Sequence, residues 1–211
     1  MRVAVLLLVL GAIAVALDDQ WLDSSPSPPS SAPSSSSRAA GPTDVPHTEH
    51  RELRSAHHGA LGEADGAVPD GTTVFDDEVP GVANLDSDLL GALRRAATDA
   101  ATDGVEFVVD SGWRSPEYQE QLLREAVVKY GSEAAAARWV ATPNTSAHVS
   151  GDAVDIGPSG AAAWLSEHGA EDGLCQIYGN EPWHFELRPD AREQGCPAMY
   201  ADPTQDPRMQ K

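Results

Sequence analysis

A short apolar segment at 153–156 carries an aspartate where a buried strand would normally be apolar throughout. Side chains alternate between the two faces of a strand, so Val154 and Ile156 share one face and Asp155 points to the other. An aspartate is disfavoured in strands and is rarely buried unless its charge is compensated. A bound cation would supply that compensation.

The segment 183–187 repeats this pattern with a histidine in place of the aspartate. One face of this strand would carry three apolar side chains, namely Trp183, Phe185 and Leu187. His184 would then point to the opposite face. His148 precedes Asp155 by seven residues, and Glu181 precedes His184 by three. We therefore predict that both strands place a potential metal ligand on the face turned away from the core.

A catalytic zinc site uses three protein ligands and leaves one position open for water. His148, Asp155 and His184 could form such a set. Glu181 is a candidate general base, since Pro182 turns the backbone before the strand and could let the carboxylate lean over the metal. The alternative is that these side chains are ordinary polar residues satisfied by hydrogen bonds.

Further residues are candidates for contact with a substrate. Amide hydrolysis needs positive charge where the oxyanion develops, and Arg114, at the junction of an expected strand and helix, could supply it; an ordinary surface cation is the alternative. Ser146 could hydrogen-bond a substrate carboxylate or simply shape its loop, and we also assign Trp183 to substrate binding. Gly151 is expected to permit a tight turn between the first two candidate ligands.

The first third of the chain has the composition of an exported tether. Residues 3–17 form an uncharged apolar run behind Arg2, and this run is short for a membrane span and typical of a secretory signal. We expect 1–17 to be a cleaved signal peptide or an N-terminal membrane anchor, and the remainder to be extracytoplasmic. Residues 18–72, rich in Ser, Pro, Ala and Gly, are predicted to be a disordered spacer. Its histidines, either a metal-binding tract or scattered linker residues, are His47, His50, His57 and His58.

The formal net charge of −19 argues against a nucleic-acid partner, because a phosphate backbone is bound by Lys and Arg. The chain contains two cysteines, Cys175 and Cys196, on either side of the segment with Glu181 and His184. In an exported chain we expect them to pair as a disulfide. Two buried free thiols are the alternative.

The folded domain is predicted at 73–200, followed by a flexible tail at 201–211. Apolar residues at helical spacing, capping residues and glycine stops predict helices at 88–103, 116–130, 133–141 and 159–168. Apolar runs and alternation predict strands at 105–110, 153–156, 175–178 and 183–187. Together these elements indicate an α+β domain.

Three segments of this domain resemble the signature motifs of the VanY-like zinc D-alanyl-D-alanine carboxypeptidases and dipeptidases. They are Ser-Gly-Trp-Arg-Ser at 111–115, Ser-x-His-x-x-Gly-x-Ala-x-Asp at 146–155 and Glu-Pro-Trp-His at 181–184. The resemblance covers about 105–190, and the second motif matches at every fixed position.

This resemblance implies that Zn²⁺ is bound by His148, Asp155 and His184. It further implies that Glu181 is the catalytic base and that Arg114 stabilises the scissile carbonyl in the transition state. The implied fold is α+β, with a small central antiparallel sheet flanked by helices.

The implied activity is hydrolysis of the terminal D-Ala-D-Ala bond of peptidoglycan stem peptides, by a chain that is secreted or membrane-anchored and faces the cell wall. A dipeptidase that cuts free D-Ala-D-Ala, or an endopeptidase that cuts a stem or cross-bridge, would use the same site. The alternative from another class is a zinc-stabilised cell-wall-binding module without turnover, although binding alone requires neither Glu181 nor Arg114. We expect a monomer.

Overall fold

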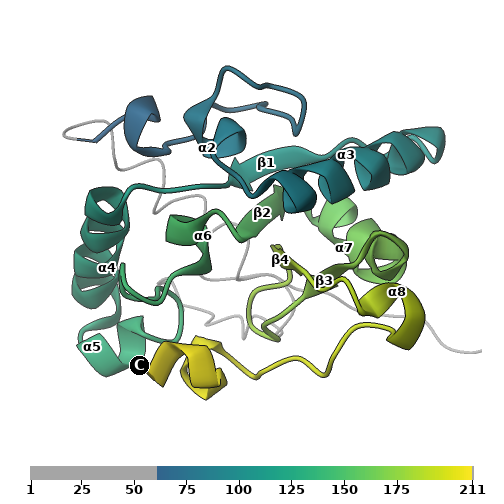
Figure 1. Cartoon of the computed structure of the whole chain (residues 1–211). Helices are drawn as coiled ribbons and strands as arrows, with labels where there is room; N and C mark the ends of the chain where they lie inside the picture. The colour runs from purple at the N-terminus through teal and green to yellow at the C-terminus, as the bar shows by residue number, and fades with distance from the viewer. Residues whose placement is uncertain (1–60, 211) are drawn as a thin grey trace, which may run out of the picture. The chain divides into compact units, whose positions relative to one another are not determined.

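The computed structural model describes residues 61–210. Its centre is a four-stranded antiparallel sheet in the order β1-β2-β4-β3 (Figure 1). The strands are β1 (Val108–Ser111), β2 (Ala153–Gly157), β3 (Leu174–Gln176) and β4 (His184–Leu187). Helices flank the sheet, so the predicted α+β class with a small central antiparallel sheet is confirmed.

The three longest helices begin at residues suited to capping or turns. At the start of α3 (Ser87–Thr102), the Asp86 side chain accepts hydrogen bonds from two backbone N–H groups of the first turn. At the start of α4 (Pro116–Tyr130), the Ser115 hydroxyl accepts a hydrogen bond from one backbone N–H group of the first turn. A proline occupies the first helical position. The third is α7 (Ser159–His168). All three predicted helices are confirmed to within one residue at either end.

Shorter helical pieces connect these elements. The α-helical ones are α2 (Pro80–Ala83), α5 (Glu133–Ala136), α6 (Ala147–Ser150) and α8 (Ala191–Gln194). The 3-10 turns are η1 (Glu63–Asp65), η2 (Gly169–Asp172), η3 (Pro203–Gln205) and η4 (Pro207–Gln210). Within residues 61–210, no helix has both the length and the apolar character needed to cross a membrane.

The helix predicted at 133–141 is shorter than expected and ends at Ala136. The chain beyond it turns back toward α4, where Gln119 Nε2 donates a hydrogen bond to the backbone carbonyl of Ala141 at 2.9 Å. This side chain satisfies a carbonyl near the expected end of the helix, so the segment forms a loop beside α4 instead.

The strand predicted at 105–110 begins only at Val108. The backbone N–H of Val105 still bonds to the carbonyl of Ala100 at 3.0 Å, so this residue completes the end of α3. The apolar alternation begins at Val105 in the sequence, but that residue belongs to the end of α3. The strand is therefore shorter than predicted.

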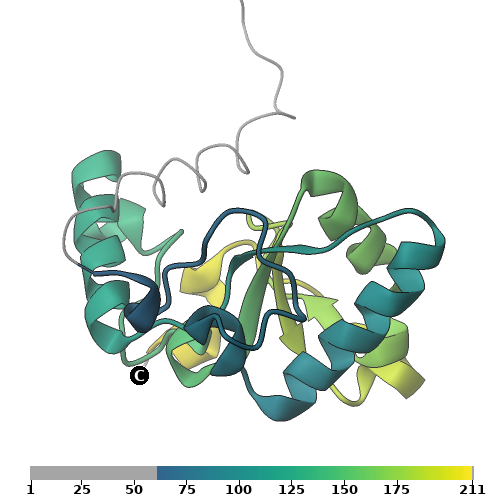
Figure 2. The same ribbon diagram turned by 90° about the horizontal axis from the view of Figure 1, so that it is seen from above.

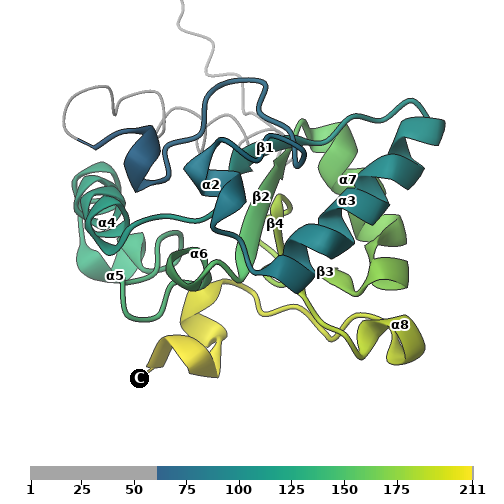
Figure 3. The same cartoon turned by 45° about the horizontal axis from the view of Figure 1, so that its top comes forward.

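One face of the sheet packs against α3 and α7 and forms the hydrophobic core (Figure 2). Val154 and Ile156 of β2 and Phe185 of β4 belong to this core, and all three are fully buried. Because side chains alternate along a strand, Asp155 and His184 project from the opposite face. Helices α4 and α5 lie across the sheet from α3 and α7 (Figures 1 and 3).

The folded unit begins before the predicted boundary at residue 73. The backbone carbonyl of Asp65 accepts a hydrogen bond from the residue that caps α4, and that of Thr72 accepts one from β1, both at 2.8 Å. Residues 61–72, predicted as the end of the spacer, therefore pack against the domain. The signal peptide or anchor predicted at 1–17 and the rest of the spacer lie outside the described residues.

The segment predicted as a flexible tail at 201–211 is largely folded. Asp202 and Asp206 are buried, with 6% and 0% exposure. Asp202 accepts a hydrogen bond from Arg138 Nε at 2.8 Å, and Asp206 accepts one from the Tyr178 hydroxyl at 3.0 Å. The segment is ordered by buried carboxylates and their partners, and such contacts leave no hydrophobic periodicity in the sequence.

Cys175 and Cys196 form the predicted disulfide, with an S–S distance of 2.03 Å. It joins β3 to the segment that follows α8. The strand β4, which carries His184, lies inside the loop that this bond closes.

Gly151 and Gly131 provide a matched test of local packing. Both follow a helix and have φ near +80°, at 81° and 80°. A Cβ at residue 151 would lie 2.6 Å from the carbonyl oxygen of Asn84, whereas a Cβ at residue 131 would meet nothing within 4 Å.

We expect Gly131→Ala to lower the free energy of unfolding by about 1–2 kcal/mol through backbone strain. Gly151→Ala should lower it by about 2–5 kcal/mol, because overpacking adds to the strain. Urea denaturation measures both values, and equal losses would contradict this account of packing at Gly151.

Candidate metal centre

Three side chains from different elements meet on the polar face of the sheet. Asp155 of β2 and His184 of β4 stand directly opposite each other in the antiparallel register, so their side chains are cross-strand neighbours. His148 comes from α6, and the turn at Gly151 connects α6 to β2. The structure thus brings together the three side chains that the sequence analysis selected as ligands.

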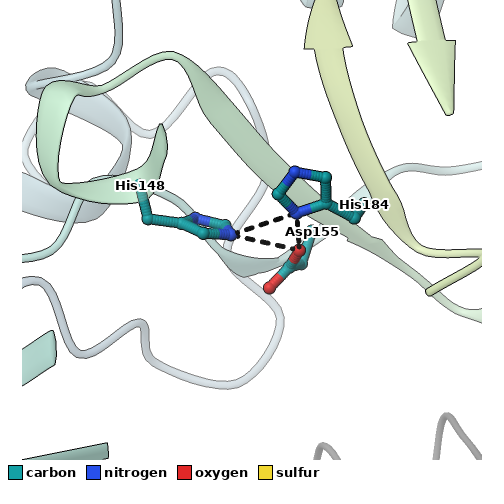
Figure 4. Close-up of side chains that lie close together, drawn as sticks. All are labelled: His148, Asp155 and His184. Atoms are coloured by element: carbon teal, nitrogen blue, oxygen red, sulfur yellow. Dashed lines mark hydrogen bonds and ion pairs between the residues drawn. The ribbon is translucent and has the colours of Figure 1, made fainter. Parts of the chain in front are cut away.

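The potential ligand atoms form a nearly equilateral triangle (Figure 4). His184 Nδ1 lies 3.2 Å from Asp155 Oδ1 and 3.3 Å from His148 Nε2. His148 Nε2 lies 3.4 Å from Asp155 Oδ1. Ligands about 2.0–2.1 Å from a tetrahedral zinc ion would stand about 3.3 Å apart. The spacing and the donor set of two imidazoles and one carboxylate therefore fit a zinc ion.

Hydrogen bonds on the far side of each imidazole orient the ring toward the cluster. His148 Nδ1 contacts the backbone carbonyl of Gly112 at 2.9 Å, and a proton on Nδ1 leaves the Nε2 lone pair facing the other ligands. His184 Nε2 contacts Glu186 Oε1 at 3.3 Å, which leaves Nδ1 for the cluster. Metal-binding histidines almost always have such a partner, because it fixes the tautomer and the ring orientation.

The two imidazoles differ in their affinity for a proton. Burial and the positive charge of Arg114 lower the pKa of His148 to about 4. Burial also disfavours a charged His184, but hydrogen bonds with Asp155 and Glu186 outweigh it and raise the pKa of His184 to about 10. At neutral pH and without a cation, His148 is therefore neutral while His184 carries an extra proton. A metal ion at this cluster must displace that proton.

Glu181 borders the cluster but is not one of its three potential ligands. Its Oε2 lies 3.8 Å from His184 Nδ1. Its Oε1 is buried and has no hydrogen-bond partner within the described part of the chain. Burial raises the pKa of Glu181 to about 8. A buried oxygen without a partner is energetically costly, so Oε1 is an atom that a bound water or substrate would satisfy.

Arg114 supports the cluster through the second oxygen of Asp155. Its Nη2 donates to Asp155 Oδ2 at 3.1 Å. Its Nε donates to Ser111 Oγ at 2.8 Å and its Nη1 to Gln119 Oε1 at 3.0 Å. The arginine is 6% exposed, which excludes the alternative of an ordinary surface cation. Asp155 therefore presents one oxygen to the cluster and the other to a guanidinium group.

A cavity of about 30 Å³ opens beside the cluster. The residues of the sequence prediction that line it are Arg114, Ser146, His148, Asp155, Glu181 and His184. Trp183 does not belong to the described lining and is 2% exposed, so the structure does not bring this expected substrate contact to the site. Trp183 lies in the turn just before β4, which begins at His184 and is one residue shorter than the predicted strand at 183–187.

A larger open groove, with a volume of about 710 Å³, adjoins this cavity. It runs between α4, α5 and the C-terminal segment, and its wall on α4 includes Leu123, Val127 and Val128. Four residues line both the cavity and the groove, namely Val140, Ala141, Pro203 and Met209. The cavity and the groove are therefore neighbours that share part of their walls.

Glu186 and Tyr178 lie next to His184 and are among the residues around the site that the sequence did not predict. Glu186 could have been found, because it follows His184 by two residues in the same strand and so shares its face. Burial would raise the pKa of Glu186, but hydrogen bonds from His184 and Arg208 lower it overall, which keeps this carboxylate ionised. Tyr178, whose ring centroid lies 5.1 Å from that of His184, follows a different strand and left no local pattern to find.

The sequence matches a known protein family over much of the described chain. Residues 82–190 match the family model described as VanY, D-alanyl-D-alanine carboxypeptidase. A curated D-alanyl-D-alanine carboxypeptidase of Enterococcus faecalis (strain ATCC 700802 / V583) is 34% identical over 111 residues, and the match covers 41% of this chain. The chain spans 41% of the length of that relative.

Two solved structures are also similar. A mutant of the vancomycin resistance D,D-pentapeptidase VanY from the VanB-type resistance cassette, in complex with Zn(II), is 31% identical with a TM-score of 0.47. That match covers 49% of this chain and 72% of the other. VanYB in complex with D-alanine-D-alanine is 30% identical with a TM-score of 0.49, and the match covers 53% of this chain and 78% of the other.

We expect the protein to bind one zinc ion at this cluster. His148→Ala should weaken zinc binding by more than about 100-fold, because a three-ligand site has no spare protein ligand. His168→Ala, which removes an exposed histidine at the end of α7, should leave the affinity unchanged. Competition with a chelating dye measures both, in a background where His47, His50, His57 and His58 are replaced by serine. Unchanged affinity in His148→Ala would rule out this site.

Zinc binding should depend on pH through His184. Because the pKa of His184 lies near 10, this residue holds an extra proton from pH 6 to pH 8. Zinc must release it, so the affinity should rise at least about tenfold per pH unit over that range. Calorimetry at pH 7 in buffers with different ionisation enthalpies should show release of about one proton or more. Affinity that stays constant from pH 6 to pH 8 would contradict this description of His184.

Proposed function

Because this chain belongs to the VanY family of D-alanyl-D-alanine carboxypeptidases, we propose that it is a zinc-dependent D,D-carboxypeptidase. Its substrate is the D-Ala-D-Ala end of peptidoglycan stem peptides, from which it removes the terminal D-alanine. The observation that carries the proposal is the buried triangle of His148, Asp155 and His184, with separations of 3.2–3.4 Å. Beside it lies Glu181 Oε1, which has no hydrogen-bond partner among residues 61–210.

His148 Nε2, His184 Nδ1 and Asp155 Oδ1 would hold the zinc ion. When bound, zinc supplies a Lewis acid that polarises a carbonyl group and lowers the pKa of water to about 7. Glu181 takes the proton of the attacking water and passes it to the amine of the departing D-alanine. A nearby divalent cation would lower the pKa of Glu181 from its raised value near 8, so that the carboxylate is ready to accept a proton at neutral pH.

Arg114 contributes positive charge and orientation. Its guanidinium borders the cavity and holds Asp155 Oδ2 at 3.1 Å. A cation in a water-poor site stabilises negative charge that develops on the carbonyl oxygen during attack. Ser146 lines the same cavity, and we assign its hydroxyl to the terminal carboxylate of the substrate.

The groove beside the cavity favours a carboxypeptidase over a dipeptidase. A stem peptide must continue away from the scissile bond, whereas a free dipeptide has no such extension. The groove adjoins the cavity through four shared residues and has a volume of about 710 Å³. We assign it to the part of the stem peptide that precedes the scissile bond.

A zinc-stabilised binding module is the second candidate, but two observations favour the enzyme. A module that only binds has no need of a buried carboxylate such as Glu181 next to the metal ligands. It also has no need of Arg114 at 6% exposure on the cavity wall.

We further propose that the chain acts outside the cytoplasm, as a monomer that is secreted or anchored facing the cell wall. The disulfide between Cys175 and Cys196 supports this location, because such bonds persist in oxidising compartments. The apolar run at 3–17 supports it as a signal peptide or anchor.

Glu181→Gln tests the proposed function in one experiment. The wild-type chain should remove a single alanine from a stem pentapeptide, as mass spectrometry detects, and a chelator should abolish the reaction. Glu181→Gln should retain zinc but hydrolyse the peptide about 10²–10⁴ times more slowly, because it cannot accept the proton. Glu167→Gln, an exposed position in α7, is the matched control and should behave like wild type.

The products separate the rival functions. Loss of both alanines together would favour an enzyme that releases the dipeptide, and a larger fragment would favour an endopeptidase. A peptide that binds and stays intact would support the binding module. Full turnover by Glu181→Gln would remove Glu181 from the mechanism.

A further inference from the structure

The buried carboxylate of Glu186 connects a proposed metal ligand to the end of the chain. Glu186 is 1% exposed, and its Oε1 contacts His184 Nε2 at 3.3 Å. Arg208 donates to the same carboxylate twice, from Nη1 to Oε2 at 2.7 Å and from Nη2 to Oε1 at 3.1 Å. Arg188 adds one contact, from Nη2 to Oε2 at 2.6 Å. A bidentate arginine fixes the orientation of a carboxylate as well as balancing its charge.

Arg208 is itself held in a closed ring of contacts. Its Nε lies 2.9 Å from Oδ2 and 3.1 Å from Oδ1 of Asp206, which is fully buried. Asp206 accepts a hydrogen bond from the Tyr178 hydroxyl at 3.0 Å. The Tyr178 ring lies 5.1 Å from the His184 ring, so the ring of contacts returns to the histidine from which it started.

The segment that carries Arg208 also borders the cavity. Pro203 and Met209 belong to the cavity lining, and the segment, drawn in yellow, runs below α6 in Figures 1 and 3. The match to the family ends at residue 190, so residues 202–210 lie beyond it. The family match therefore gives no role to this segment, whereas its contacts lead directly to His184.

We propose that residues 202–210 form a C-terminal latch on the metal centre, in which Arg208 is a positioning residue that acts on His184 through Glu186. The inference rests on the proposed zinc site. Without Arg208, Glu186 loses its bidentate partner and keeps only Arg188, which contacts Oε2, so Oε1 is held less firmly against His184 Nε2. The imidazole is then free to turn, and Nδ1 spends less time directed at the cluster. Within residues 61–210, Arg208 forms hydrogen bonds and ion pairs with Glu186 and Asp206 but with none of the three proposed ligands, and it lies outside the lining of the cavity.

Zinc affinity of the full chain, measured by competition with a chelating dye, tests the latch without depending on turnover. We expect Arg208→Ala to weaken zinc binding about tenfold, at the low end of the 10–100-fold effect of removing an outer partner. Glu186→Gln should weaken it by about 10–100-fold. In the Glu186→Gln background, Arg208→Ala should change the affinity by less than about twofold, because both substitutions interrupt the same contact.

Arg138→Ala is the matched control. Arg138 binds the same segment through Asp202, at 2.8 Å, but does not contact Glu186. It should leave zinc affinity within about twofold of wild type if the latch works through Glu186. An equal loss in Arg138→Ala and Arg208→Ala would overturn the proposal, because general loosening of the segment would explain both.

Other outcomes are equally decisive. Unchanged affinity in Arg208→Ala, or additive losses in the double variant, would overturn the latch while the zinc site stands. A wild-type chain that binds no zinc would remove the proposed function and the latch together. If circular dichroism shows that Arg208→Ala fails to fold, Arg208→Lys replaces it, since lysine keeps the charge and lacks the planar fork. It should weaken zinc binding about threefold, and full affinity in that variant would contradict the role of the bidentate contact.

Discussion

The antiparallel pairing of β2 with β4 buries a carboxylate beside an imidazole, and the rest of the site follows from the need to balance that charge. Asp155 stands opposite His184 and is 1% exposed. A buried carboxylate is tolerated only when it is paired and hydrogen-bonded. His184 meets one oxygen and Arg114 the other, at 3.2 and 3.1 Å. His148 completes a triangle in which a divalent cation can replace a proton.

Each imidazole of this triangle also has a polar partner on the side that faces away from the other ligands. His148 contacts a backbone carbonyl at 2.9 Å, and His184 contacts Glu186, which two arginines hold. Such connected polar groups specify one geometry more than they add stability. The ligand atoms are therefore oriented before a metal arrives, which is the condition for a site that must bind tightly and still leave one position open. Glu181 borders the triangle, and its Oε1 has no hydrogen-bond partner among residues 61–210, which is the basis on which we propose it as the general base.

Strand alternation in the sequence predicts the faces that Asp155 and His184 take, because their neighbours are apolar at a spacing of two. It does not predict register, since a slide of β4 by two residues would keep every side chain on its face and separate the two ligands. The sequence does not predict the fold of residues 202–210 for a related reason. Its order depends on Arg208 meeting Glu186, 22 residues earlier in the chain, and a polar segment shows no periodicity that reports such a contact. The motif predicts a substrate contact for Trp183, whereas this side chain is 2% exposed and lies outside the cavity lining.

Anomalous diffraction at the zinc edge, from crystals of the zinc-loaded chain, tests the central claim most directly. The account predicts a peak about 2.0–2.1 Å from His148 Nε2, His184 Nδ1 and Asp155 Oδ1, with the Glu181 carboxylate nearby and outside the coordination sphere. A zinc ion held elsewhere, for example by the histidines at 47–58, with this triangle closed by its own hydrogen bonds, would contradict it.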